Sequence, residues 1–336
     1  MSSWAYLFDK RGHILDEFDG VFRRSWAMNA EGECRFTLPI NDRKNTLNNF
    51  QFGNHIVVLN NDGLPPWSGR LTTPRSWGNK TNKHFARSHA AVWDYRIGKY
   101  TLPYVMINQA GVIARHLLEV ANLREDTLIR PGKIHYGGHA CGAIISPAKK
   151  LQAFIDHIVK QSGHEWEIAP VINNNKLILY LNWYDEIGVE TGASLNDSNC
   201  RIDENSLQEN GPIYNLLLGI GTEQEVRNHH LAINRASQDM FGLYEMPYEV
   251  DAVEAVAVKA LTEEQLAYLS WPRRAFRATA SKVNDFYKQL RIGNRAQFES
   301  AESGYGARGR VGTQAEVRIL GMAYTDDADG VALTII

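Results

Sequence analysis

Short apolar runs recur over the first hundred residues, with polar turn residues between them. The runs are Ala5–Phe8, Phe36–Ile40, His55–Leu59, Gly69–Thr72 and Phe85–Trp93. Runs of this length, bounded by turn signals such as Asn61-Asp62-Gly63, are typical of β-strands. Pro65-Pro66 predicts a loop or a sheet edge, because proline has no backbone N–H to donate. The first third therefore predicts an all-β unit.

The period of the apolar positions becomes helical after residue 103. A first helix is predicted over 107–121, from its apolar stripe Ile113, Leu117, Val120 and Ala121. A second has a clearer stripe, at Leu151, Phe154, Ile155, Ile158 and Val159. Ser146 is its predicted N-cap, Pro147 its first residue and Gly163 the residue just past its end. A hairpin of 165–171 and 176–184 follows, because the asparagines at 173–175 tolerate the left-handed conformation of a tight turn.

The last third mixes the two periods again. Ile213–Ile220 predicts a strand, and Thr262 with Gln265 forms a capping-box pattern before a short helix that Pro272 ends. Strand patterns return at Phe298, Val311, Val317–Ile319 and Val331–Ile335. The closing apolar strand must pair with another strand, since an open apolar edge aggregates.

One short pattern occurs near both ends of the chain. FQFGNHIVVL at 50–59 and LRIGNRAQFE at 290–299 both place Gly-Asn directly before an alternating strand. Gly accepts backbone angles that other residues avoid, so the dipeptide allows a sharp redirection of the chain. Gly-Asn is also common punctuation before a strand, but the similar surroundings favour two related β-barrels.

Together these elements predict an α+β, β-rich chain with two related β-barrel domains and intervening α+β domains. The predicted divisions are an N-terminal barrel at 1–102, an α+β domain at 103–205, a strand with a small α+β segment at 206–283, and a second barrel at 284–336 that takes strands from 206–250. A length of 336 residues suits two or three domains.

Composition excludes several classes of protein. The 36 basic and 38 acidic residues give a formal charge of −2 without long runs, which disfavours polyanion binding and adsorption to an anionic membrane. The three cysteines form no CxxC pair, and this predicts a reducing compartment rather than a disulfide framework. The start MSSWAYLFDKRG lacks the apolar run of a signal peptide, and no segment approaches 18 apolar residues, so no membrane span is expected.

Metal and nucleotide sites find little support. His135, His139 and Cys141 in HYGGHAC offer metal ligands without a fourth at the expected spacing. His229 and His230 are adjacent in a strand and face opposite sides. The loop at 219–221 lacks the third glycine of a dinucleotide motif, and Glu223 and Glu225 would repel a pyrophosphate.

Hydrolase chemistry is no better marked. Two of four carboxylates could form a glycosidase pair, but the sequence does not indicate which two. They are Asp94, Asp185, Glu186 and Glu245. Trp166, Trp183 and Tyr184 could stack on sugars, but a hairpin beside a helix favours core positions. Residues 326–330 resemble a calcium loop without its Glu, so a turn between the final strands is expected. No catalytic, cofactor-binding or metal residue is therefore predicted.

The order of these weak motifs resembles a known family. The segments 216–252 (LLGIGTEQEV…PYEVDA), 260–276 (ALTEEQLAYLSWPRRAF) and 290–336 are similar to baseplate-hub and tail-tip-hub proteins of tailed bacteriophages. Residues 22–71, ending in WSGRL, resemble the N-terminal hub barrel. The Gp37-like siphovirus hub family has the most similar layout, and the myophage baseplate hub is also similar. The segments 219–223 and 241–245 are the most specific part.

The resemblance implies a non-enzymatic virion protein of the phage tail tip or baseplate, assembled in the host cytoplasm. It implies a homotrimer that adapts the sixfold tail tube to a threefold tip, because two barrels in each of three chains give six. The implied partners are the distal tail, tail tube, tape measure and tip, spike or receptor-binding proteins, with no nucleic-acid specificity. A tail-associated peptidoglycan hydrolase or glycan-binding module remains the alternative, and a hub of a contractile injection system is a third possibility.

Overall fold

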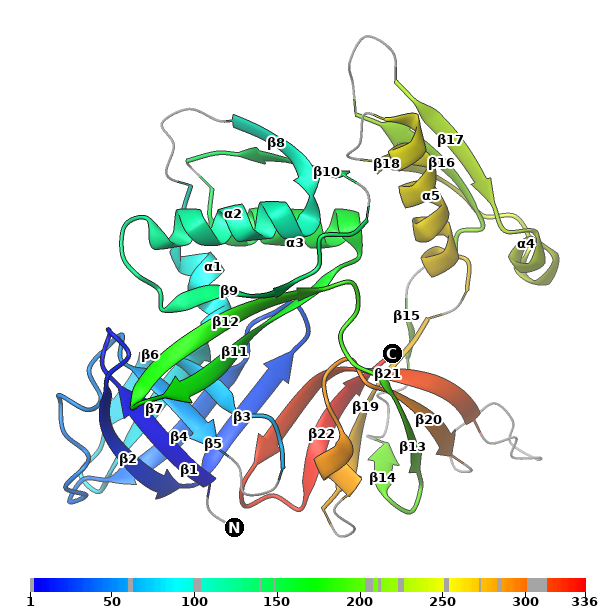
Figure 1. The fold of residues 1–336 in the computed structure, drawn as a ribbon. Helices are drawn as coiled ribbons and strands as arrows, with labels where there is room; N and C mark the ends of the chain where they lie inside the picture. The colour runs from blue at the N-terminus through cyan, green and yellow to red at the C-terminus, as the bar shows by residue number, and fades with distance from the viewer. Residues whose placement is uncertain are drawn as a thin grey trace.

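A computed structural model gives the fold of this chain (Figure 1). It describes residues 3–59, 63–98, 104–138, 140–147, 149–202, 208–210, 213–222, 227–250, 254–271, 273–282, 286–300 and 313–336. Five residues named in the sequence predictions lie outside this part of the chain: His139, Glu223, Glu225, Pro272 and Val311.

The largest feature is one curled sheet of fourteen strands that combines strands from both ends of the chain. Its main path runs β14-β19-β22-β21-β3-β4-β7-β6-β5-β1-β2, and β13, β15 and β20 attach beside it. We call β1–β7 the front half and β13–β15 with β19–β22 the rear half. The two halves meet where β21 pairs with β3.

The front half follows the alternation of the first third of the sequence. Its strands are β1 (Ser3–Phe8), β2 (Ile14–Gly20), β3 (Phe22–Ala27), β4 (Glu33–Pro39), β5 (His55–Leu59), β6 (Trp67–Trp77) and β7 (Thr81–Ser88). In β4 the inward residues Cys34, Phe36 and Leu38 are buried and the residues between them are exposed. The strands enclose an aromatic core of Phe18, Phe22, Phe36 and Phe50.

The rear half takes its strands from two separate stretches of chain. They are β13 (Glu190–Asn196), β14 (Cys200–Ile202), β15 (Gln208–Asn210), β19 (Arg273–Ser281), β20 (Arg295–Ser300), β21 (Thr313–Thr325) and β22 (Gly330–Ile335), with a short helix η2 (Phe286–Gln289) before β20. The closing strand β22 pairs on both sides, with β19 and β21, as its apolar sequence requires.

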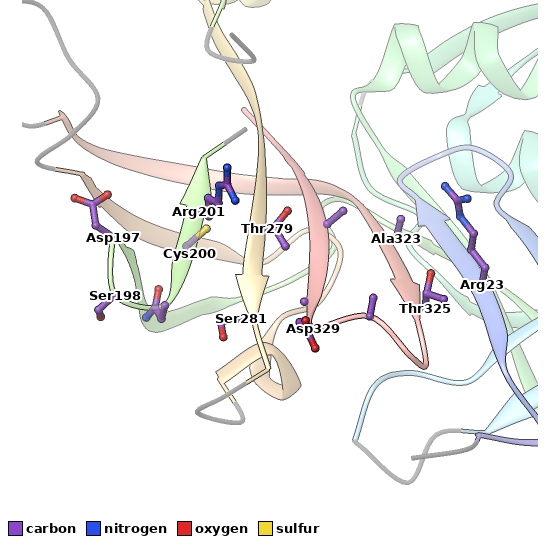
Figure 2. A pocket seen from close by; sticks show the side chains of 14 residues that line it. Arg23, Asp197, Ser198, Cys200, Arg201, Thr279, Ser281, Ala323, Thr325 and Asp329 are labelled. Carbon is purple, nitrogen blue, oxygen red and sulfur yellow. The ribbon is translucent and has the colours of Figure 1, made fainter. Parts of the chain in front are cut away.

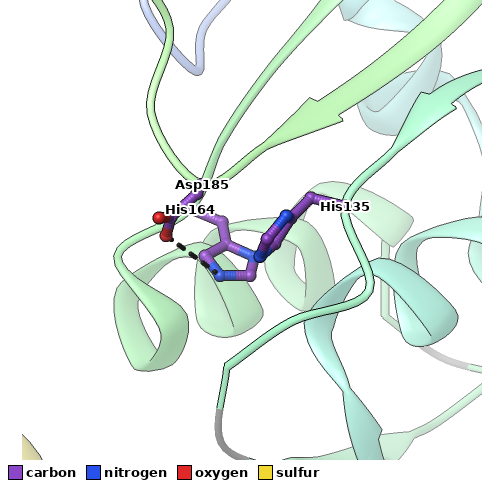
Figure 3. A group of neighbouring side chains, drawn as sticks. All are labelled: His135, His164 and Asp185. Carbon is purple, nitrogen blue, oxygen red and sulfur yellow. Dashed lines mark ion pairs between the residues drawn. The ribbon is translucent and has the colours of Figure 1, made fainter.

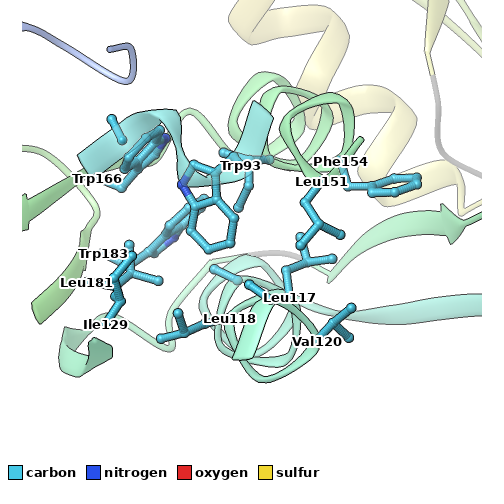
Figure 4. Packing of buried hydrophobic residues seen from close by; sticks show 14 of the residues in the cluster. Trp93, Leu117, Leu118, Val120, Ile129, Leu151, Phe154, Trp166, Leu181 and Trp183 are labelled. Carbon is cyan, nitrogen blue, oxygen red and sulfur yellow. The ribbon is translucent and has the colours of Figure 1, made fainter. Parts of the chain in front are cut away.

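An α+β unit lies on the front half (Figure 1). It comprises η1 (His89–Ala91), α1 (Val92–Tyr95), β8 (Tyr104–Gln109), α2 (Ala110–Asn122), β9 (Ile129–Ile134), β10 (Ala140–Ile145), α3 (Leu151–Ser162), β11 (Glu165–Asn173) and β12 (Lys176–Tyr184). Its core contains Trp93, Trp166 and Trp183 and reaches Phe8 and Val57 of the front half (Figure 4). This core fixes the unit to the large sheet.

A small unit is inserted between β15 and β19. It consists of β16 (Leu216–Gly221), β17 (His229–Ile233), α4 (Arg235–Phe241), β18 (Glu245–Val250) and α5 (Ala255–Leu269). Strands β16, β17 and β18 pair only with one another among the described strands, whereas β15 pairs with β19 of the rear half. The sequence predicted that strands of 206–250 belong to the second barrel. Among the described strands of that range, β15 pairs with the rear half, whereas β16, β17 and β18 form their own sheet.

Several predicted helix boundaries are wrong. The 107–121 helix begins at Ala110, because 107–109 belong to β8, which pairs with β10. The second helix begins at Leu151 with Lys150 as its N-cap, because Lys150 is extended and bridges to Ile97, but its end at Gly163, with φ +70°, is as predicted. Thr262 is not a cap: its hydroxyl donates to the Val258 carbonyl at 2.6 Å in the middle of α5.

Other local predictions are confirmed. Strand β5 has its predicted bounds, and Asn174 and Asn175 adopt positive φ in the β11–β12 turn. The predicted strand run Phe85–Trp93 is a strand only up to Ser88, and from His89 onwards it is helical. The predicted class, α+β and β-rich, is confirmed, and the predicted barrels near the two ends correspond to the two curled halves of the sheet. None of the helices in the described ranges has the length and apolar character that a membrane crossing requires.

Candidate functional site

The Gly-Asn pattern of the front half forms a hydrogen-bonded corner before β5. Gly53 has φ +91° and donates its N–H to the Leu71 carbonyl at 3.0 Å, while the Leu71 N–H returns to the Asn54 carbonyl at 2.8 Å. The Asn54 side chain donates to the carbonyls of Asn48 and Asn49 at 2.8 and 3.1 Å. The corner thereby ties the start of β5 to β6.

The rear half contains the same corner before β20. Gly293 has φ +85° and donates to the Ile319 carbonyl at 2.8 Å, and the Ile319 N–H returns to the Asn294 carbonyl at 3.0 Å. The Asn294 side chain donates to the Gln289 carbonyl at 3.3 Å, five residues before it, as Asn54 does to Asn49. Leu71 and Ile319, at equivalent places, are both fully buried.

The match extends to the strands around each corner. The antiparallel order β5-β6-β7-β4 of the front half corresponds to β20-β21-β22-β19 of the rear half. The pairs agree in register, since His55 faces Arg70 as Arg295 faces Arg318. The outer neighbours differ: β1 is antiparallel to β5, whereas β13 is parallel to β20. The two halves are thus two versions of one four-stranded unit.

A buried ion pair holds the two halves together. Arg24 of β3 pairs with Asp326 of the β21–β22 turn, and both side chains are almost completely buried. Asp326 also accepts hydrogen bonds from the Ser3 hydroxyl at 2.6 Å and the Phe22 N–H at 2.8 Å. The guanidinium carbon of Arg24 lies 5.1 Å from the centre of the Tyr324 ring. This junction, which we call the internal junction, covers the edge of β21 with β3.

A second ion pair links the α+β unit to the rear half. The Glu165 carboxylate of β11 binds both terminal nitrogens of Arg318 in β21, at 2.5 and 2.7 Å. Glu165 also accepts the Ile187 N–H at 2.6 Å, and Arg318 donates to the Ile187 carbonyl at 2.8 Å. Bidentate geometry makes this pair directional as well as strong. The loop between β12 and β13 is therefore held against the rear corner.

A buried histidine pair lies under the α+β unit. His55 Nδ1 and His89 Nε2 are 2.9 Å apart, and His89 Nδ1 is 2.9 Å from the Ser68 hydroxyl. The other His55 nitrogen bonds to the backbone of Lys10. Each side chain can donate one hydrogen bond to the next: the Ser68 hydroxyl to His89, the His89 ring to His55, and the His55 ring to the Lys10 backbone. Burial lowers the pKa of His55 to about 4 and that of His89 well below its usual value, so both rings are neutral. All three side chains are buried, so the arrangement is structural.

One group of possible metal ligands gathers beside the β12 end. His135, His164 and Asp185 place a ligand atom each within 4.8 Å of one another, the single such group among the residues searched (Figure 3). His164 Nδ1, however, accepts the Trp183 indole N–H at 2.9 Å. A neutral His164 therefore carries its proton on Nε2, which faces Asp185 at 3.6 Å and has no lone pair for a metal. As arranged, the trio does not fit a metal ion.

The other candidate metal ligands, Cys141, His229 and His230, do not form a common site. Cys141 is buried, and burial raises its pKa to about 11, so it remains a thiol. His229 and His230 lie on opposite faces of β17, as predicted: His229 is exposed, and His230 reaches Glu263 of α5 at 3.3 Å. The two rings therefore do not point towards a common metal position.

The loop-like glycines at 219–221 belong to a strand. A Cβ at Gly219 would lie 1.8 Å from the Thr262 hydroxyl, so glycine is needed where β16 packs against α5. This close packing explains why residue 219 is a glycine, without any role in binding a dinucleotide.

The carboxylates proposed for sugar chemistry mostly form ion pairs. Asp94 binds Lys150 at 2.6 Å and Arg87 at 3.3 Å, and the Lys150 ammonium lowers its pKa. Glu186 binds Arg295 at 2.7 Å, Asp185 lies beside His164, and Glu245 is exposed on β18. Trp166 and Trp183 are core residues, as predicted (Figure 4), whereas Tyr184 is half-buried and its hydroxyl donates to Glu167 at 3.0 Å. Residues 326–329 form the predicted turn between β21 and β22.

A hollow of about 700 Å³ runs along the rear half and reaches Arg23 of β3. Figure 2 shows its side chains spread along neighbouring strands, from Asp197 and Arg201 at one side to Arg23 at the other. They do not converge on one point, as a reaction centre requires. The hollow is a surface of the sheet rather than a catalytic cleft.

The residues that connect the parts were not identified from the sequence. Arg24 carried a usable signal, because FRRSWA places it between Phe22 and Trp26 on the inward face of a strand, where an arginine needs a buried partner. No sequence signal indicated that Glu165 pairs with Arg318, because the two residues are 153 positions apart.

No protein-family model matches the sequence, and no curated protein matches it significantly. The fold, in contrast, matches solved tail proteins over almost the whole chain. A 43 kDa tail protein of prophage MuSo2 from Shewanella oneidensis aligns with a TM-score of 0.60 at 11% identity, over 100% of this chain and 98% of that one.

Two further tail proteins agree equally well. Prophage tail protein gp18 from Listeria monocytogenes EGD-e gives a TM-score of 0.60 at 10% identity, covering 98% of this chain and 94% of its own. A tail protein from Neisseria meningitidis MC58 gives 0.59 at 12% identity, covering 100% and 96%. The fold is that of phage tail proteins, and the resemblance predicted from the sequence is confirmed at this level.

Proposed function

We propose that this chain is a structural hub protein of a phage tail tip or baseplate that acts without catalysis. Three copies form a ring, and the two halves in each copy present six similar units to a sixfold tail tube. The ring presents three copies of the whole chain to a threefold tip. The protein resides in the virion after assembly in the host cytoplasm.

The matched corners at Gly53-Asn54 and Gly293-Asn294 are the observation that carries this proposal. A chain that builds the same four-stranded unit twice places two similar surfaces on one molecule. In a closed ring, such a chain doubles the apparent symmetry of the assembly. The tail-protein fold of the whole chain supports the same assignment.

Several finer expectations form part of the proposal. The partners are the distal tail and tail tube proteins, the tape measure protein, and tip, spike or receptor-binding proteins. The domain division at 1–102, 103–205, 206–283 and 284–336 is also proposed, and the rear barrel would draw β13 and β14 from the second of these segments.

Native mass spectrometry of the purified full chain tests the ring. A mass of three chains, and ring-shaped particles with threefold symmetry in electron micrographs, are expected. A chain that remains monomeric at micromolar concentration and releases soluble fragments from peptidoglycan would instead support the hydrolase alternative. Binding of purified tail tube protein to the ring tests the proposed partner.

A further inference from the structure

A groove on the front half, beside the internal junction, is lined by four cationic side chains. It has a volume of about 580 Å³ and extends over β3, β4, β7 and the end of β6. The cations are Arg23, Arg35, Arg75 and Lys83, and the Asp327 carboxylate also lines the groove. The lining therefore has an excess of three positive charges, although the whole chain has a formal charge of −2. We call this feature the cationic groove.

The strand register brings three of these cations together on one face of the sheet. Arg23 of β3 lies directly opposite Arg35 of β4. Arg35 lies opposite Phe85 of β7, so Lys83, two residues away on β7, is its diagonal neighbour. All three cationic side chains are exposed. Like charges on directly opposed strand positions destabilise a sheet, so this arrangement favours an anion that binds between them.

The chain itself supplies few counter-charges to the groove. Arg35 pairs with the exposed Glu33 at 3.0 Å. No carboxylate in the described part of the chain, Asp327 included, forms an ion pair with Arg23 or Lys83. Two exposed cations of the groove are thus available to a partner.

The arginines of the groove are positioned without loss of their charge. The Arg75 guanidinium donates to the Phe50 carbonyl and lies 5.7 Å from the centre of the Trp77 ring. The guanidinium of Arg35 lies 5.4 Å from the centre of the Phe85 ring. Neither a carbonyl nor an aromatic ring neutralises a guanidinium. A side chain that is already held in place loses less entropy when a ligand binds.

A buried histidine without hydrogen-bond partners also lines the groove. His84 is 2% exposed and stacks on Phe36, with the ring centres 5.1 Å apart. Neither ring nitrogen has a partner within the described residues, which is unusual for buried polar atoms. Burial lowers the pKa of His84 to about 4, so the ring adds no charge at neutral pH. The groove therefore combines a cationic rim with an uncharged aromatic lining.

We infer that the cationic groove binds an acidic segment of another tail protein. Guanidinium groups bind carboxylates through paired hydrogen bonds, which matches the arginines of the rim. Val21, which is 50% exposed, and Pro74 also line the groove and offer contacts to apolar side chains between the carboxylates. This inference rests on the proposed function for the class of partner, and it adds the chemistry by which that partner is bound.

Two other occupants match the groove less well. None of the described strands carries more than two carboxylates on one face, so a strand of a second copy would not balance three excess charges. Surfaces that bind nucleic acid place cations along a phosphate backbone over a longer stripe, whereas these cations share one short groove with apolar residues. The charge and the apolar lining together favour an acidic protein segment.

Fluorescence anisotropy of the purified full chain tests this inference. The probe is a short labelled peptide of alternating glutamate and leucine, and a peptide with glutamine in place of each glutamate is its control. We expect the glutamate peptide to bind about 10-fold or more tightly than the glutamine peptide, and its binding to weaken as salt is added. Equal binding of the two peptides would overturn the inference.

The double variant Arg23→Gln, Lys83→Gln tests the site itself. Both side chains are exposed, so we expect glutamate-peptide binding to weaken about 10-fold or more without a fall in the midpoint of thermal unfolding. Lys133→Gln with Lys176→Gln is the matched control, because these exposed lysines of β9 and β12 lie outside the groove. The control should bind the peptide as the wild type does. Equal weakening in both double variants would overturn the groove as the site.

Further measurements separate the possible occupants. Displacement of the glutamate peptide by a single-stranded DNA oligonucleotide at a lower concentration than by unlabelled peptide would overturn the acidic-protein assignment. In native mass spectrometry the double variant should assemble as the wild type does, and a loss of assembly would show that a second copy fills the groove. A wild-type chain that is monomeric but binds the glutamate peptide would overturn the proposed ring and support the inference about the groove.

Discussion

Gly53 and Gly293 hold the same backbone conformation in different surroundings. A Cβ at Gly53 would meet the flexible end of Lys10 at 3.2 Å, whereas one at Gly293 would meet the Ile187 backbone carbonyl oxygen at 2.2 Å. The first neighbour yields easily, and the second does not.

Alanine substitution should therefore separate the two corners. We expect Gly53→Ala to lower the free energy of unfolding by about 1 kcal/mol, from the positive φ alone. Gly293→Ala should cost roughly 3 kcal/mol or more, because backbone overlap adds to the same strain. Urea denaturation measures both, and equal losses would contradict the difference in packing.

The histidine pair gives the protein a defined sensitivity to acid. Burial lowers the pKa of His55 from 6.5 to about 4, so the unfolded chain takes up a proton before the folded one does. Stability from this residue is complete above pH 6.5 and is lost as the pH falls from 6.5 towards 4, by an amount on the order of 3 kcal/mol. His89 acts in the same direction.

His55→Gln tests this behaviour through the slope of stability against pH rather than through stability itself. We expect a shallower loss between pH 6.5 and 4 than in the wild type. His229→Gln is the control, because that exposed ring on β17 should leave the slope unchanged. An unaltered slope in His55→Gln would show that other groups govern the acid response.

At the scale of elements, the Arg24–Asp326 pair decides whether β3 and β21 remain joined. Asp326→Asn leaves a buried guanidinium without its counter-charge and should cost about 3–5 kcal/mol. Arg24→Met alone should cost a similar amount, and the double variant less than the sum of both, since neither charge is then left alone.

The exposed Arg35–Glu33 pair, 3.0 Å apart on β4, provides the matched comparison. Glu33→Gln should change the free energy of unfolding by at most about 1 kcal/mol. Thermal or urea unfolding of all four variants completes the cycle, and additive losses in the double variant would contradict coupling across the junction.

The sequence predicted elements well where the signal was local. Strand β5, the end of α3 at Gly163 and the Asn174-Asn175 turn depend on neighbouring residues, and all three agree with the structure. The predicted start of α3 failed, because Lys150 is extended and bridges to Ile97, a partner distant in the sequence, despite the Ser146-Pro147 cap signal.

Predictions failed where the conformation depends on a residue that is distant in the sequence. Thr262 occupies the middle of α5 because Gly219 lets the helix lie close to β16. The matched corners were predictable because both copies are written in the sequence, whereas their distant contacts, such as Glu165 with Arg318, were not.

At the scale of the whole molecule, the Glu165–Arg318 pair positions the α+β unit against the rear half. We expect Glu165→Gln to release the loop 185–189, because that loop is held through Ile187 by both members of the pair. Hydrogen exchange should increase there without change in the front half. Glu167→Gln, on the same strand but exposed, should leave the loop protected. Equal exchange in both variants would contradict this role.

The shared edge of β21 also affects how the protein is made. Strand β3, at residues 22–27, pairs with β4 on one side, but its second partner is β21 at residues 321–325, so this pairing cannot form until the ribosome has passed residue 325. During synthesis the nascent front half therefore carries one open strand edge, which is the condition under which newly made chains associate wrongly. Products truncated before residue 321 would retain this open, association-prone edge.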